Sequence, residues 1–190
     1  HIMRRRQRQM CIRDRIVDEY GNALSMTSTI ESSFGSRLMT NGGFLLNNEL
    51  TDFSFQKEKK GKRVANNIEP NKRPRSSMAP TIIFKNDKPL FIIGSPGGSN
   101  IIGYVVNSII GLVDWKMNVQ QAASIPHAIN KFGTFYLEKN SKISLLKKQL
   151  EKKGYKVKLR NFHSGLNIIQ IKKKLFGGSD HRREGIAIGY

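Results

Sequence analysis

Residues 90–115 constrain the fold more than any other part of the sequence. Residues 90–93 are a short apolar run, and the glycine-rich string 94–99 follows it directly. Apolar residues then recur over 100–115 at i, i+1, i+4 and i+5, a spacing that is typical of a helix packed on a sheet. The segment therefore predicts a strand, a tight turn and a helix in direct succession.

The glycines of this turn are the first candidate functional residues. Gly97 and Gly98 stand just before the expected helix, where glycine lets the backbone approach a ligand closely. Successive backbone N–H groups at a helix N-terminus attract anions. A tight strand-to-helix turn without a ligand would need the same glycines, so both interpretations stay open.

Two adjacent hydroxyls beside basic side chains are the second candidate. Ser76 and Ser77 follow Arg73 and Arg75 in a polar stretch. Hydroxyl donors near cationic groups favour a carboxylate ligand, although serines are also ordinary turn residues. Together with the glycine turn, the pair indicates an acyl-transfer site that holds a carboxylate and stabilises an oxyanion.

The remaining patterns predict an α+β layered fold with mostly antiparallel sheets. Two hairpins are expected, with turns at residues 19–22 and at Asn86 and Asp87. The other expected elements are a short helix at 118–124, a helix at 141–153 capped by Ser141 and Gly154, strands at 155–159 and 167–171, a turn at 177–180 and a last strand at 186–190.

Composition limits the classes of partner. The chain has 190 residues, 38% of them hydrophobic, which is enough for one buried core. Its formal net charge of +19 raises nucleic acid, an anionic membrane surface or small acidic ligands as partners. Because no zinc-ligand spacing or RNA-recognition motif is present, a basic nucleic-acid-binding domain stays only as an alternative.

Metal and membrane functions have no support in the pattern. Cys11 is the only cysteine, which excludes an internal disulfide and a multi-cysteine metal site. His127, His163 and His181 lack ligand spacing, and we expect them at the surface or in turns. No apolar run is long enough to span a membrane. We therefore expect no cofactor and no membrane span.

The first fifteen residues differ from the rest of the chain. They hold six arginines and one aspartate, a net charge of +5, and almost no apolar periodicity. Residues 10–15 match a translation of the transposon end sequence used to prepare sequencing libraries. We therefore expect residues 1–15 to be a non-native basic tail and residues 16–190 to form the domain; an ordinary basic tail is the alternative.

Short motifs follow one another in a specific order along residues 16–190. They are Gly21-Asn22-Ala23, Thr27-Ser28-Thr29, Leu45-Leu46-Asn47-Asn48-Glu49, Asp52-Phe53-Ser54, Lys72-Arg73-Pro74, Ser76-Ser77-Met78, Gly94-Ser95-Pro96-Gly97-Gly98-Ser99, Ser179-Asp180 with Arg182, and Gly189-Tyr190. In this order they resemble the small, C-terminal subunit of γ-glutamyltransferases (glutathione hydrolases), which are N-terminal-nucleophile hydrolases.

The resemblance implies an αββα sandwich, of which this chain supplies the C-terminal portion. In this family a precursor cuts itself, and a threonine becomes the N-terminus of the small subunit. That threonine attacks the γ-glutamyl amide of glutathione, and the acyl-enzyme passes its acyl group to water or to an amino acid or peptide. The implied partners are γ-glutamyl compounds and the large subunit of the same precursor, and the implied location is periplasmic or extracellular.

Three positions match the family's catalytic residues. Thr29 matches the threonine that hydrogen-bonds the nucleophile and assists its activation, although threonine in a strand is also favoured for packing. Gly97 and Gly98 match the backbone N–H donors of the oxyanion hole. The nucleophile threonine itself has no match, because its position falls on Cys11 within the tail. The resemblance therefore implies a fragment that is inactive alone.

Five positions match the family's substrate-binding residues. Asp52 matches the carboxylate that binds the substrate α-ammonium, and Glu49 the Gln or Glu beside it. Glu31 falls where many members have Asn. Ser76 and Ser77 match the pair that donates to the substrate α-carboxylate. Asp52 could otherwise cap a turn or a helix.

Two further alternatives remain at this point. A related cephalosporin or glutaryl acylase would use the same scaffold, but a glutaryl group has no ammonium for Asp52 to bind. A fragment of this kind could also be a non-catalytic remnant.

Overall fold

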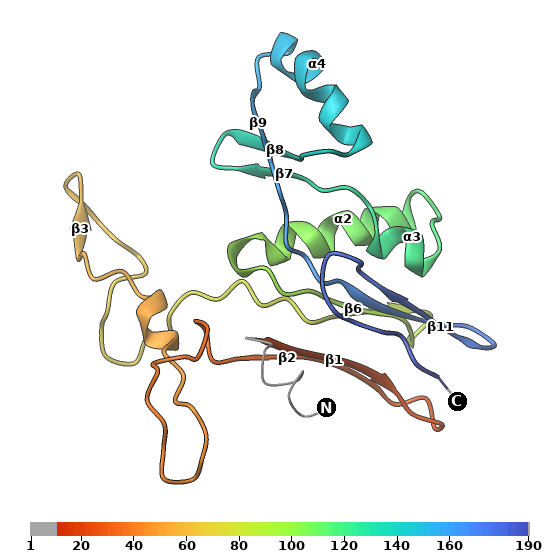
Figure 1. Cartoon of the computed structure of the whole chain (residues 1–190), viewed down its shortest axis with the longest axis horizontal. Coiled ribbons are helices and arrows are strands. Elements are labelled where there is room, and N and C mark those ends of the chain that lie inside the picture. The colour runs from red at the N-terminus through yellow and green to blue at the C-terminus, as the bar shows by residue number, and fades with distance from the viewer. Residues whose placement is uncertain (1–10, 190) are drawn as a thin grey trace. The chain divides into compact units, whose positions relative to one another are not determined.

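The computed structural model describes residues 11–189 (Figure 1). The chain divides into two compact units. Unit 1 contains residues 28–77 together with residues 11 and 12, and unit 2 contains residues 13–27 and 78–189. The candidate residues divide with them: Thr29, the carboxylates and the serines lie in unit 1, and the glycine turn lies in unit 2.

A four-stranded antiparallel sheet forms the centre of unit 2, in the order β11-β10-β6-β5. Its strands are β5 (Thr81–Lys85), β6 (Lys88–Gly94), β10 (Asn167–Ile171) and β11 (Leu175–Ser179). The helices α2 (Ile101–Val113) and α3 (Val119–Ala123) pack on one face of this sheet (Figure 1). The strand, turn and helix predicted over 90–115 are confirmed.

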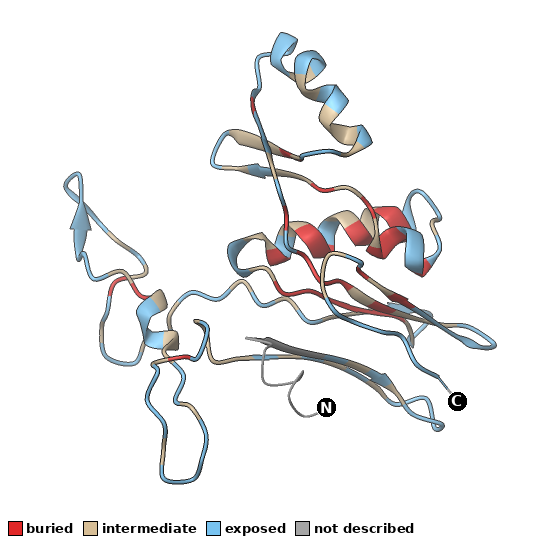
Figure 2. Ribbon diagram, viewed as in Figure 1, coloured by how far each residue is buried: buried red, intermediate tan, exposed pale blue. Residues whose placement is uncertain are grey.

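The core of unit 2 lies between α2 and the sheet. Buried apolar side chains of β6, such as Phe91 and Ile93, pack there with Tyr104 and Val105 of α2. Figure 2 shows buried residues along both elements in red. Burial of such side chains is the main favourable contribution to folding. The helix is therefore fixed on the strand that leads into the glycine turn.

A second sheet in unit 2 is three-stranded, with the order β7-β8-β9. Its strands are β7 (Ala128–Lys131), β8 (Thr134–Glu138) and β9 (Lys156–Arg160), and β8 and β9 are parallel. The sequence did not predict β7 or β8. The helix expected at 141–153 is the 3-10 helix η3 (Lys142–Leu146) followed by α4 (Lys147–Lys152), and the Ser141 hydroxyl donates to the Glu138 carbonyl (2.7 Å) instead of capping it.

Two predictions near the C-terminus are wrong. Residues 177–179 belong to strand β11, and the turn before it lies at 172–174. Glycine occurs in β11 because neighbours approach its backbone: a Cβ on Gly178 would lie 2.6 Å from the Val119 carbonyl oxygen. Residues 186–189 form no strand, and Ala187 instead packs against Gly177.

The first hairpin consists of β1 (Cys11–Val17) and β2 (Ala23–Thr29). Asp18 stabilises its turn by accepting the backbone N–H groups of Tyr20 (3.0 Å) and Asn22 (2.8 Å), and Gly21 has a positive φ of 86°. The predicted hairpin is confirmed. Strand β1 begins at Cys11, within the segment that we expect to be a tail; the side chains of residues 11–13 and all of residues 1–10 lie outside the description.

Unit 1 is built mainly of loops. Its regular elements are η1 (Glu49–Asp52) and the two-residue strands β3 (Glu58–Lys59) and β4 (Lys62–Arg63). Phe53 is buried, whereas large apolar side chains such as Phe34, Phe44, Leu50 and Phe55 are exposed. None of the helices in residues 11–189 is both long and apolar enough to span a membrane.

Candidate active site

Three carboxylates come together in unit 1. Glu31 follows β2 with a left-handed φ of 70°, and Glu49 and Asp52 are the two ends of η1. Asn48 links these segments: its amide donates to Ser32 Oγ (3.0 Å), its carbonyl oxygen accepts from Ser32 N (3.0 Å), and its backbone N–H donates to the Ile30 carbonyl (3.3 Å).

The carboxylates create a concentration of negative charge. Partial burial, followed by the charges of Asp52 and Glu31, raises the pKa of Glu49. Glu49 Oε2 is buried and accepts no hydrogen bond from the described residues. A buried carboxylate oxygen normally has a partner, so this one is available to a cationic donor. An ammonium group fits this arrangement by charge and by hydrogen bonding.

Thr29 and Asp52 are held by local hydrogen bonds. Thr29, half-buried at the end of β2, accepts the backbone N–H of Glu31 at Oγ1 (3.0 Å). The Asn66 side chain donates to the Asp52 carbonyl (2.7 Å) and accepts from Arg75 N (2.9 Å). Asn66 therefore connects η1 to the irregular segment that ends in the serine pair.

The serine pair lies at the end of unit 1. Ser76 is exposed and Ser77 is half-buried, directly after Arg75. The structure thus brings Asp52 and the serine segment together through Asn66, a residue that the sequence analysis did not select. Only the preference of Asn for backbone-like hydrogen bonds in loops could have suggested it.

The glycine turn in unit 2 has the conformation that the sequence predicts. Gly97 and Gly98 both have positive φ, 135° and 54°, and the 3-10 helix η2 (Gly98–Asn100) continues into α2. The first N–H groups of such a helical segment have no carbonyl partner within it. The turn therefore presents backbone donors at a helix N-terminus, as an anion site requires.

Comparison with known proteins identifies the family. The family profile described as Gamma-glutamyltranspeptidase matches residues 11–190. The glutathione hydrolase proenzyme of Bacillus subtilis (strain 168) is 38% identical over 181 residues, a match that covers 92% of this chain. This chain belongs to the gamma-glutamyltranspeptidase family. It spans 30% of the length of that proenzyme, so it corresponds to a part of such a protein.

Solved structures agree with the family assignment. A mutant of Helicobacter pylori gamma-glutamyltranspeptidase superposes with a TM-score of 0.81 at 38% identity, covering 90% of this chain and 99% of that one. The fold is thus that of an N-terminal-nucleophile hydrolase, as predicted. A cephalosporin acylase from Bacillus halodurans shares the fold with a TM-score of 0.73, but at 22% identity. The acylase comparison therefore concerns the fold alone.

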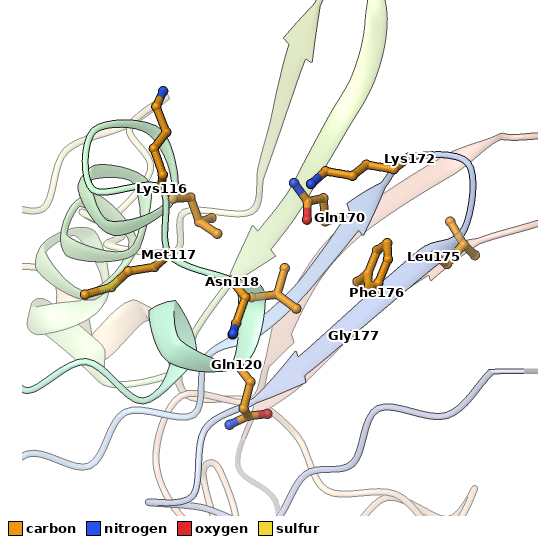
Figure 3. Close-up of a pocket in the computed structure, with 11 residues that line it drawn as sticks. Lys116, Met117, Asn118, Gln120, Gln170, Lys172, Leu175, Phe176 and Gly177 are labelled. Carbon is orange, nitrogen blue, oxygen red and sulfur yellow. The ribbon is translucent and has the colours of Figure 1, made fainter.

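A pocket of this gamma-glutamyltranspeptidase domain is lined by residues of unit 2 (Figure 3). It opens in unit 2 beside α3, β10 and β11, and its lining includes Met117, Val119, Gln170 and Phe176. None of the sequence-predicted site residues lines it. Among residues 11–189, no group of three or more His, Cys, Asp or Glu side chains could hold a metal ion.

A buried polar network in unit 2 was not expected. Arg182 Nε and Nη2 donate to Glu138 Oε1 (2.6 Å) and Oε2 (2.8 Å), and Arg182 Nη1 donates to Asp180 (3.0 Å). Burial alone would raise the pKa of Glu138 and of Asp180. Hydrogen bonds from Arg182 to Glu138, and from Ser164 and Arg182 to Asp180, nevertheless lower both. Both carboxylates therefore stay ionised beside the guanidinium.

His127 completes this network, so the prediction that it lies at the surface or in a turn is wrong. Its side chain has 0% of its surface exposed, and Nε2 lies 2.8 Å from Ser164 Oγ, which in turn donates to Asp180. Burial, followed by the charge of Arg182, lowers the pKa of His127 to about 4. The imidazole is therefore neutral at pH 7. His163 and His181 are exposed, as predicted.

Proposed function

We propose that this chain is the small-subunit part of a γ-glutamyltransferase that cleaves the γ-glutamyl amide of glutathione through an acyl-enzyme. The acyl group then passes to water or to an amino acid or peptide. The observation that carries the proposal is the carboxylate cluster, in which Glu49 Oε2 has no hydrogen-bond partner among the described residues. Family membership supplies the chemistry that this cluster would serve.

Each candidate residue has a role in the proposal. Asp52, Glu49 and Glu31 bind the α-ammonium of the γ-glutamyl donor by charge-assisted hydrogen bonds. Ser76 and Ser77 donate to its α-carboxylate. In unit 2, the backbone N–H groups of Gly97 and Gly98 stabilise the oxyanion that forms at the γ-carbonyl.

Thr29 assists the nucleophile in this scheme. The nucleophile would stand at the position of Cys11, at the N-terminus that precursor cleavage creates. A free α-amine there would serve as the base. We propose that residues 1–15 are not native and that a threonine belongs at this position. The nucleotide sequence upstream of residue 16 in the source genome tests this directly, because a reading frame without that threonine would contradict it.

The proposed partner is the remaining, larger part of the same precursor. Two observations support this: the chain spans 30% of the Bacillus subtilis proenzyme, and apolar side chains of unit 1 such as Phe34, Phe44 and Phe55 are exposed. Exposed apolar surface of this kind commonly marks an interface. We propose an exported, periplasmic or extracellular enzyme, in keeping with the family.

The decisive experiment compares two anilides that differ in one group. The complete precursor containing this chain should release 4-nitroaniline from γ-glutamyl-4-nitroanilide at least tenfold faster than from glutaryl-4-nitroanilide, which lacks the ammonium. Asp52→Asn should lower kcat/KM for the γ-glutamyl substrate about tenfold to a hundredfold, because one charged hydrogen bond contributes about 1.5–3 kcal/mol. The glutaryl substrate should barely respond to this substitution.

A preference for the glutaryl substrate would overturn the proposal in favour of an acylase. The 190-residue chain alone should release no aniline over many turnovers. Sustained release by it would contradict the requirement for a nucleophile at the precursor cleavage site.

A further inference from the structure

The glycine turn of unit 2 rests against a buried aromatic side chain. Tyr104 of α2 has 1% of its surface exposed, and its ring edge lies behind Gly97 so closely that a Cβ on Gly97 would collide with Tyr104 Cε2. Gly98, in contrast, has open space at the same position. The ring therefore fills the space into which the backbone of Gly97 could otherwise move.

Tyr104 is itself fixed on its other sides. Its ring centroid lies 4.3 Å from that of His127 and 5.9 Å from that of Phe162, the latter in a T-shaped arrangement. Burial raises the pKa of the Tyr104 phenol, and hydrogen bonds with the His163 backbone and the Asn100 side chain oppose this rise. Asn100 belongs to η2, so the phenol lies near the helical turn that follows the glycines.

The support continues behind His127. Its Nε2 lies 2.8 Å from Ser164 Oγ, and Ser164 donates to Asp180. The same segment of chain also holds the residues before the glycines: Gly165 N donates to Ser95 Oγ (3.2 Å), and Ser95 Oγ donates to the Pro96 carbonyl (2.8 Å). Hydrogen bonds of Ser95 thus hold the chain before Gly97, and the Tyr104 ring packs against Gly97 itself.

We propose that Tyr104, supported by His127, is a positioning residue that fixes the Gly97 and Gly98 backbone for oxyanion binding. The proposal rests on the proposed function of the glycine turn. Oxyanion contacts form in the transition state and not with the bound substrate, so a displaced donor lowers kcat and leaves KM nearly unchanged. A displacement of about 1 Å can cost about 100-fold in rate.

The test replaces the ring and counts working active sites. In the complete precursor, Tyr104→Leu should lower kcat per covalently titrated active site about 100-fold, with KM within about twofold. Tyr104→Phe keeps the ring and should stay within about fivefold of the parent. Phe91→Leu is the matched control, since Phe91 is a buried ring (5% exposed) of the same core and lies within β6, six residues before Gly97. It should lower the melting temperature comparably but leave kcat within about twofold.

An equal loss of kcat in Tyr104→Leu and Phe91→Leu, or a change in KM alone, would overturn the proposal. Should Tyr104→Leu fail to fold, Tyr104→Met keeps the core filled without a flat ring. Amide hydrogen exchange of residues 97–99 is the second measurement, and we expect it to be at least tenfold faster in Tyr104→Leu than in Phe91→Leu.

The exchange measurement also separates the two proposals. A parent precursor without γ-glutamyl hydrolysis would refute the proposed function. The exchange rates would still decide whether Tyr104 fixes the turn.

Discussion

The two units stabilise their charged side chains in different ways. In unit 1, Glu69 pairs with Arg63 and with Lys72 (2.7 Å), and the side chains remain 68%, 31% and 30% exposed for Arg63, Lys72 and Glu69. In unit 2, Arg182 pairs with Glu138 (2.6 Å) and Asp180 (3.0 Å), whose side chains are only 13% and 0% exposed.

This difference determines what each cluster contributes. An exposed ion pair is screened by water and salt and contributes little to the free energy of unfolding. Burying a charged triad costs free energy because its groups lose water. Removing one partner costs far more, because the remaining charges stay buried without an opposite charge. The same contrast holds for apolar groups, since unit 2 has a packed core and unit 1 exposes most of its large apolar side chains. Unit 1 should therefore open at a lower free energy than unit 2.

The largest effect is expected from breaking the buried triad. Arg182→Met should reduce the free energy of unfolding by about 3–5 kcal/mol, because Asp180 and Glu138 would remain buried without their cation. Urea denaturation followed by circular dichroism measures this loss. Arg183→Met, at the adjacent position, is the control and should cost less than about 1 kcal/mol. A loss of similar size in both variants would show that the triad does not act as a buried unit.

The next largest effect is the loss of stability at low pH that His127 causes. Because burial lowers the pKa of His127 from 6.5 to about 4 in the folded state, the unfolded chain binds the proton more tightly. The free energy of unfolding is therefore not reduced by His127 above pH 6.5. As the pH falls from 6.5 towards 4, protonation of His127 in the unfolded chain reduces it by about 3 kcal/mol.

His127→Gln keeps a donor for Ser164 but cannot titrate. Its unfolding free energy should thus fall less steeply than that of the parent between pH 6.5 and 4. Chemical denaturation across this range measures the difference. Identical slopes for His127→Gln and the parent would contradict the burial argument.

A smaller effect should be confined to unit 1. Gly35 has a φ of 53°, and a Cβ there would collide with the Leu46 carbonyl. Gly35→Ala should destabilise the loop by about 2 kcal/mol through strain and collision. Gly43 has a φ of 79° with open space around it, so Gly43→Ala carries the backbone strain alone. Limited proteolysis within residues 28–77 should be faster for Gly35→Ala than for Gly43→Ala.

The smallest effect is expected from the exposed ion pair. Arg63→Ala should cost less than about 1 kcal/mol, and the loss should shrink further in high salt. Denaturation at low and high ionic strength measures both quantities. A loss comparable with that of Arg182→Met would remove the distinction between the two units.

Local features of the sequence were predicted well. Asn86 and Asp87 both adopt positive φ, 52° and 57°, in the hairpin turn, as the Asn-Asp pair between two apolar runs predicts. Gly154 ends α4 with a φ of 88°. The apolar period over 100–115 located α2 to within two residues. In each case a short stretch of chain contains the whole physical cause.

Predictions that depended on distant contacts did less well. The glycines at 177 and 178 suggested a turn, but they lie in β11 because α3 and Ala187 press against that strand. Strands β7 and β8 were missed because their stability comes from pairing with each other and with β9. His127 was predicted at the surface or in a turn, since nothing near it in the chain indicates Ser164 as its partner.

The sequence by itself determined the family motifs, the strand–turn–helix segment and the residue types of the candidate site. Periodicity and the backbone freedom of glycine act over a few residues, so they are visible without a structure. The tertiary structure alone decided that one buried oxygen of Glu49 has no hydrogen-bond partner among residues 11–189. It also decided that Asn66 connects Asp52 to the serine segment by hydrogen bonds, and that the Tyr104 ring packs against Gly97. Burial, pKa and hydrogen-bond satisfaction depend on which distant groups meet, and only the folded chain brings those groups together.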